Sequence, residues 1–174
     1  MKQRKWVLLV LIALTVPVMA QNEDLETVAG KVAQRLQTAM PGWQHQRINP
    51  VEGSDGVIND HWQSSNRIVN ISVVRYDSAN KARETMQPFI RYMRQKEELT
   101  GLGDEAYAWG YGLSNVIFRR GRYIVTLDAF ADVNSDPDAR TLTPLQRGER
   151  ERSEMKRLTR EFAKHVAMAM DSRE

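Results

Sequence analysis

The turn Arg120-Gly121 constrains the fold of this chain more than any other feature of the sequence. Strand-like segments flank it at 115–119 and 122–130, and a third strand-like segment precedes them at 106–111. Glycine can take the positive φ that a tight hairpin requires. Strands joined by such a short connection pair antiparallel. We therefore predict an antiparallel meander in this part of the chain.

Helical periodicity marks three other segments. Apolar residues spaced three and four apart predict a helix over 23–40 and a second one that begins after Asp77 or Ser78. Pro88 either kinks the second helix or starts a short new one. The residues Thr143 to Gln146 form a capping-box pattern with proline at the first helical position, which predicts a long helix to about Met170.

The section from Trp43 to Tyr76 is rich in turn residues and predicts two or three antiparallel strands, the strongest over 67–76. Together these elements predict a single α+β domain over 21–174. Its antiparallel sheet has five or six strands. The sheet is flanked by an N-terminal helix, a middle helix and a long C-terminal helix packed on one face.

The first twenty residues have the pattern of a signal peptide. Basic residues at 2, 4 and 5 precede an apolar run, which ends in Val18-Met19-Ala20. The run is short for a membrane-spanning helix, so we expect cleavage after Ala20 and a periplasmic or extracellular protein without a transmembrane segment. An uncleaved anchor is the alternative. A lipid anchor is excluded because the chain has no cysteine.

Charge and composition exclude several classes of function. Three of the 25 basic residues lie in the leader, so the rest carries 22 basic and 22 acidic residues and offers no basic surplus for nucleic acid. Without cysteine there is no disulfide and no thiol nucleophile. The three histidines, His45, His61 and His165, lack the spacing of metal ligands. We expect no metal and no cofactor.

Aromatic residues alternate with small ones over Ala106 to Gly112. With a period of two, Tyr107, Trp109 and Tyr111 share one face of a strand, and the small residues share the other. The small face lets a helix approach closely. The aromatic face is either ordinary core or a platform for a sugar ring or an apolar ligand.

Charged residues next to this strand supply the other candidates. Asp104 and Glu105 are either carboxylates of an enzyme with a distant partner, or a turn residue that accepts backbone N–H bonds beside one paired with an arginine. Arg119, Arg120 and Arg122 either receive an anionic ligand or lipid headgroup, or form a solvated loop tip.

Two segments, 101–107 with its Gly-Asp-Glu-Ala turn and 118–125 with its Arg-x-Gly hairpin, resemble a pattern in small exported bacterial domains. These domains include lipoproteins and sensor-like domains of unassigned activity. The resemblance implies an α+β fold with an antiparallel sheet and brings no catalytic residue. The chain departs from the lipoproteins in lacking the anchoring cysteine.

The first functional hypothesis is therefore a non-enzymatic exported domain that binds a small molecule, a glycan or an envelope protein. Its candidate binding residues are Asp104, Glu105, Tyr107, Trp109, Tyr111, Arg119, Arg120 and Arg122. The alternatives are a hydrolase-like enzyme that uses Asp104 or Glu105, and an envelope-interaction protein that uses the charged first half of the last helix.

Overall fold

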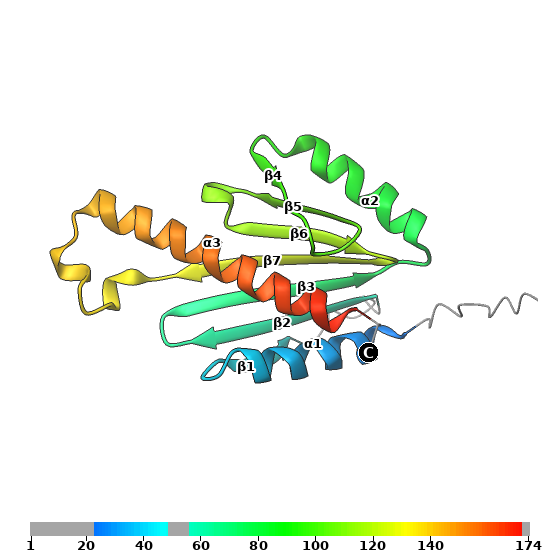
Figure 1. Ribbon diagram of the computed structural model, residues 1–174, viewed down its shortest axis with the longest axis horizontal. Helices are drawn as coiled ribbons and strands as arrows, with labels where there is room; N and C mark the ends of the chain where they lie inside the picture. Colours follow the sequence, from blue (N-terminus) through cyan, green and yellow to red (C-terminus); the bar gives the residue numbers. More distant parts are fainter. Residues whose placement is uncertain (1–22, 49–55, 172–174) are drawn as a thin grey trace, which may run out of the picture.

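The computed structural model describes residues 23–48 and 56–171, which form one antiparallel sheet and three α-helices (Figure 1). The α+β class and the antiparallel sheet are therefore confirmed. The predicted strand number is wrong, because the sheet has seven strands rather than five or six. The predicted signal peptide, 1–20, lies outside the described residues.

The sheet has the strand order β1-β2-β3-β7-β6-β5-β4, and all neighbours are antiparallel. The strands are β1 (Gln44–Ile48), β2 (Val57–Ser64), β3 (Arg67–Arg75), β4 (Lys96–Glu98), β5 (Glu105–Trp109), β6 (Asn115–Arg120) and β7 (Tyr123–Ala131). The predicted meander is β5-β6-β7. The additional strand is β4, whose sequence Lys-Glu-Glu has low strand propensity and pairs with the edge of β5.

Two of the three helices begin after capping residues that the sequence predicts. The helices are α1 (Leu25–Ala39), α2 (Ala79–Tyr92) and α3 (Pro144–Ala169). Ser78 rather than Asp77 caps α2, and Thr143 forms the predicted capping box with Gln146. Pro88 lies inside α2, so the chain forms one helix there instead of starting a second one.

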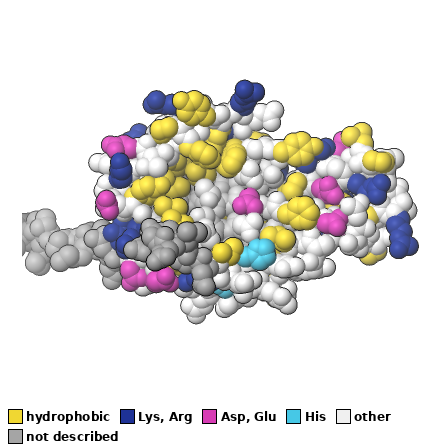
Figure 2. All heavy atoms as spheres, turned by 180° about the vertical axis from the view of Figure 1, so that it is seen from behind, with side chains coloured by type: hydrophobic (Ala, Val, Ile, Leu, Met, Phe, Trp, Pro, Cys, Tyr) yellow, Lys and Arg dark blue, Asp and Glu magenta, His cyan; other side chains and the backbone are white. Residues whose placement is uncertain are grey.

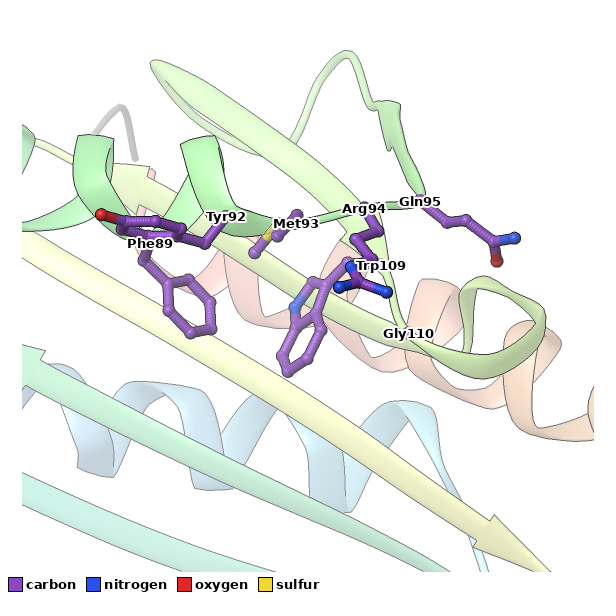
Figure 3. Close-up of a pocket in the computed structure, with 7 residues that line it drawn as sticks. All are labelled: Phe89, Tyr92, Met93, Arg94, Gln95, Trp109 and Gly110. Atoms are coloured by element: carbon purple, nitrogen blue, oxygen red, sulfur yellow. The ribbon is translucent and has the colours of Figure 1, made fainter.

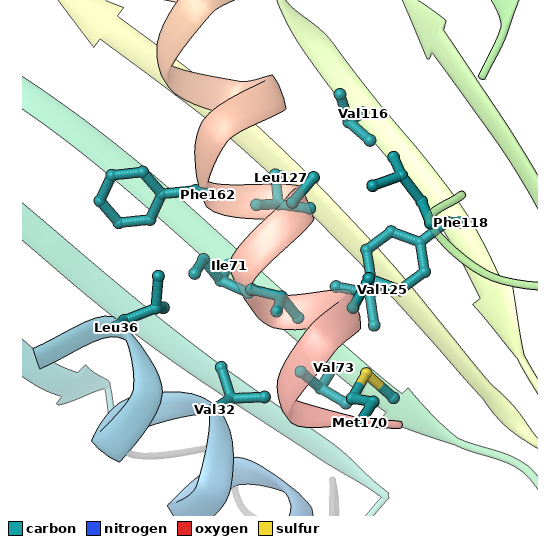
Figure 4. Packing of buried hydrophobic residues seen from close by; sticks show 14 of the residues in the cluster. Val32, Leu36, Ile71, Val73, Val116, Phe118, Val125, Leu127, Phe162 and Met170 are labelled. Carbon is teal, nitrogen blue, oxygen red and sulfur yellow. The ribbon is translucent and has the colours of Figure 1, made fainter. Parts of the chain in front are cut away.

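The main core lies between one face of the sheet and the helices α1 and α3, which lie side by side on it (Figures 1 and 4). Trp62, Phe118 and Phe162 are fully buried in it. Ala106 also belongs to this core, so the small-residue face of β5 lies on the side of the sheet that α1 and α3 cover. The first part of α3 extends beyond the sheet (Figure 1).

The opposite face of the sheet is covered by α2 alone among the described helices, and only over part of its width. Met86 and Ile90 of α2 pack there on Ile117 of β6 and Ile124 of β7. Figure 2 shows this face, with hydrophobic side chains gathered over one part of it. None of the described helices combines the length and the apolar character needed to cross a membrane.

An apolar pocket beside Trp109

Strand β5 places two of the three predicted aromatic side chains on the α2 face. Tyr107 and Trp109 pack against the small core under α2. The prediction for Tyr111 is wrong, because the strand ends at Trp109 and Gly110 follows with a φ of 80°. Tyr111 begins a 3-10 helix, Tyr111–Leu113, and its hydroxyl accepts a hydrogen bond from Arg152 of α3. The three aromatics therefore do not form one platform.

A pocket of about 420 Å³ lies between the end of α2 and the end of β5. This volume falls within the range of small-molecule sites, and apolar side chains dominate the lining. Figure 3 shows the rings of Phe89 and Trp109 side by side, both pointing away from α2 toward the middle of the sheet. The lining residues are Phe89, Tyr92, Met93, Arg94, Gln95, Trp109 and Gly110.

Two aromatic side chains of the pocket are unusually exposed. Phe89 is 44% and Tyr92 is 86% exposed, although both line the same pocket as the half-buried Trp109. Phe89 meets the Trp109 ring edge to face, with centroids 5.3 Å apart. Exposed apolar side chains that adjoin one another mark interaction sites, whereas isolated ones are ordinary. This clustering distinguishes the pocket from a plain gap between a helix and a strand.

Two polar groups at the pocket, one cation and one hydrogen-bond donor, have no partner among the described residues. The exposed Arg94 forms no ion pair with any residue that the structure describes. The buried indole nitrogen of Trp109 has no hydrogen-bond acceptor within the described residues. Lys96, by contrast, donates to the carbonyl of Ile90 at 3.0 Å and lies over the Tyr107 ring. The pocket thus presents a mostly apolar wall with Arg94 at its rim.

Tyr107 stays a neutral donor beside this site. Burial, and then the negative charges of Glu105 and Glu98, raise the pKa of its hydroxyl above the ordinary value. The hydroxyl donates to Glu105 at 3.4 Å. Tyr107 does not line the pocket, so it supports Trp109 from the next position on the same face of β5.

The two candidate carboxylates bind groups of the protein itself. Asp104 accepts hydrogen bonds from the backbone of Gly121 at 2.8 Å and from Arg119 at 2.7 Å. It is therefore a turn carboxylate that accepts a backbone N–H bond, and its neighbour Glu105 lies 3.8 Å from Nε of Arg119, as in the second interpretation of the sequence. Glu105 accepts a hydrogen bond from Gln87 of α2 at 2.7 Å. Neither carboxylate lines the pocket.

The three arginines around the hairpin separate toward different elements. Arg119 pairs with Asp104. Arg120 contacts the carbonyl of Ala167 near the end of α3 and pairs with Asp171 at 3.1 Å. Arg122 donates to the carbonyl of Glu23 at 2.7 Å. These contacts join the hairpin to both ends of the described chain, and none of the three side chains reaches the pocket.

The sequence pattern does not indicate the α2 side of the pocket. Phe89 and Met93 follow the helical spacing of a buried stripe, and only the structure shows that Phe89 is half exposed. Tyr92 lies outside that stripe. One sequence signal could have indicated the pocket. Tyr92 follows Phe89 by three residues near the end of the helix, and side chains at this spacing are neighbours on a helix surface.

The described residues contain no group of three or more histidines or carboxylates arranged for a metal ion. Comparison of the chain with protein-family models, with curated proteins and with solved structures found no match. The function must therefore follow from the chemistry of the pocket.

Proposed function

We propose that this protein is a non-enzymatic binding domain and that its pocket beside Trp109 receives the apolar part of a small molecule. The observation that carries the proposal is the exposure of Phe89 and Tyr92 around a cavity of about 420 Å³. An alkyl chain bound in the pocket covers these rings and removes their apolar surface from water. This burial contributes about 25 cal/mol of binding free energy per Å².

The charged groups support binding rather than catalysis. The pocket lining contains no carboxylate and no histidine, and its one charged side chain is the guanidinium of Arg94, which is not a general acid or base at neutral pH. Asp104 and Glu105, the carboxylates of the enzyme alternative, are hydrogen-bonded to other parts of the fold. The leader pattern of the sequence supports a place of action in the periplasm or outside the cell.

Saturation-transfer NMR on the full-length protein, with 1-octanol as an apolar probe, tests the proposal. We expect transfer to the methylene hydrogens and an affinity in the millimolar range. Tyr92→Ala should weaken binding about fivefold, because the probe loses roughly 40 Å² of apolar contact at about 25 cal/mol per Å². Tyr92 is 86% exposed, so its removal leaves the fold intact.

The matched control is Leu145→Ala at the start of α3. Leu145 is 71% exposed but does not line the pocket, so this variant should bind 1-octanol as the wild type does. Equal loss of binding in both variants would show nonspecific adsorption to exposed apolar side chains. That result, or an absence of binding to the wild type, contradicts the proposed function.

A further inference from the structure

A polar row crosses the part of the sheet that α2 leaves open. His61 of β2 lies opposite Asn70 of β3, and Asn70 lies opposite Asp128 of β7. His61 Nδ1 is 2.9 Å from Asn70 Oδ1, and Asn70 Nδ2 donates to Asp128 Oδ2, also at 2.9 Å. Asp128 is exposed, and the other two side chains are half-buried. The row is therefore a continuous hydrogen-bonded chain on an open surface.

This chain sets the orientation of each group in it. The carboxylate of Asp128 only accepts hydrogen bonds, so it holds the amide nitrogen of Asn70 toward itself. The amide oxygen of Asn70 then faces His61, and Nδ1 of the neutral ring must carry the proton. Nε2 of His61 is left as an acceptor. The row thus ends in a preoriented acceptor for a hydroxyl group.

The row leads directly to the pocket. Trp109 of β5 lies opposite Asn115 of β6, and the neighbouring pair Val116 and Leu127 places Asn115 opposite Asp128. Adjacent strands lie about 4.8 Å apart, so Asp128 is about 10 Å and His61 about 19 Å from Trp109 along the row. A single ligand of moderate length can reach both the pocket and the row.

The side chains around the row suit neutral hydroxyl groups. The alternation of the strands gives this face of β1, β2 and β3 no lysine and no arginine within the described ranges. Amides and hydroxyls both donate and accept hydrogen bonds, as sugar hydroxyls require. Phe130, two residues after Asp128, is 57% exposed and offers an aromatic surface. The polar side chains flanking the row on this face are Gln44, Gln46, Asn59, Gln63, Ser72 and Thr126.

We propose that the ligand is an amphiphile whose apolar tail enters the pocket and whose neutral, polyhydroxylated head group, a sugar, lies on the row from Asp128 to His61. This inference rests on the proposed function, because it assigns the tail to the same pocket. It adds the chemical class of the head group and the residues that recognise it. The absence of cations on this face of the described β1–β3 disfavours an anionic head group at the row.

The test compares octyl maltoside, below its micelle concentration, with 1-octanol and octanoate in the same NMR assay. We expect octyl maltoside to bind about tenfold more tightly than 1-octanol, with saturation transfer to its sugar hydrogens. His61→Gln and Asp128→Ala should remove this advantage without changing the affinity for 1-octanol. Gln37→Ala, which removes an exposed amide from α1 on the other face of the sheet, is the matched control and should keep the advantage.

The outcomes separate the two proposals. Equal affinity for octyl maltoside and 1-octanol, or an advantage that survives both row variants, overturns the sugar inference and leaves the pocket proposal standing. Tighter binding of octanoate also overturns it, because charge recognition by Arg94 then outweighs hydroxyl recognition. If neither octyl maltoside nor 1-octanol binds, the proposed function fails and this inference fails with it.

Discussion

Glu154 of α3 lies between two guanidinium groups. It accepts a hydrogen bond from Arg157 at 2.8 Å and another from Arg67 of β3 at 2.8 Å. These bonds, with that of Arg157 the larger cause, lower the pKa of Glu154 from its ordinary value of 4.5 to about 2. Because the side chain is only 19% exposed, the interaction is less screened than an ordinary surface ion pair. It ties the last helix to the start of β3, an inner strand of the sheet.

This lowered pKa predicts a pH-dependent stability difference. A carboxylate with a depressed pKa in the folded state stabilises above its unfolded pKa and loses that contribution as the pH falls through the folded pKa. Glu154→Gln should therefore lower the free energy of unfolding at pH 7 by about 1 kcal/mol. The difference from wild type should shrink between pH 4.5 and about 2.

Urea unfolding at a series of pH values measures this difference. The control is Glu149→Gln on the same helix, since Glu149 is exposed and makes no ion pair with the described residues. A deficit of Glu154→Gln that stays constant down to pH 2 would show that the charge of Glu154 is not its cause.

His61 permits a second prediction for a single residue. The hydrogen bonds of the polar row, from His61 to Asn70 and from Asn70 to Asp128, should hold the neutral His61 ring as the Nδ1–H tautomer. Long-range ¹H–¹⁵N spectra, taken at a pH where the ring is neutral, distinguish the tautomers. We expect the Nδ1–H form in the wild type and a mixture in Asn70→Leu. A predominant Nε2–H form in the wild type would contradict the hydrogen bond from His61 Nδ1 to Asn70.

The sequence predicts individual site residues only where a local rule decides their position. Period-two alternation places Tyr107 and Trp109 correctly, and it fails at Tyr111 because Gly110 turns the backbone out of the strand. The row from His61 to Asp128 was not predictable, because its residues come together through the register of three strands. Register depends on the whole sheet rather than on neighbouring residues.

At the scale of elements, the sequence pattern predicts all three helices and five or six of the seven strands. The exception is β4, whose charged residues carry no strand pattern and form a strand only because β5 offers a free edge. The sequence pattern also does not predict the order of the strands in the sheet. The central pair β3 and β7 is separated by α2 and three other strands along the chain.

Two glycines in different elements should respond oppositely to alanine. Gly30 lies exposed within α1, and an added Cβ meets no atom within 4 Å. Gly30→Ala should therefore stabilise the protein by about 0.5–1 kcal/mol, since alanine loses less backbone entropy in a helix. At Gly103, before β5, an added Cβ would overlap the backbone carbonyl of Arg119.

Gly103→Ala should therefore destabilise the protein by about 1–3 kcal/mol, because backbone must move to make room. Urea unfolding of both variants checks the pair. A loss of stability in Gly30→Ala would mean that α1 contacts something there in solution. An unchanged stability in Gly103→Ala would contradict the close approach of this turn to β6.

The whole molecule divides its sheet into two faces with different roles. The face under α1 and α3 contains most of the buried apolar side chains and holds the fold together. The other face is covered by α2 over β6 and β7, and no other described helix covers the pocket or the polar row. This unequal cover is the structural basis of the binding proposal.

The indole ¹H–¹⁵N signals of the tryptophans test that proposal most directly. Trp43 and Trp62 belong to the main core, whereas Trp109 lines the pocket, so the core signals are internal controls. Trp109→Phe assigns the relevant signal. On addition of octyl maltoside below its micelle concentration, we predict a saturable shift of the Trp109 signal and none for Trp43 or Trp62. An unmoved Trp109 signal, or equal shifts of all three, would contradict binding at the pocket.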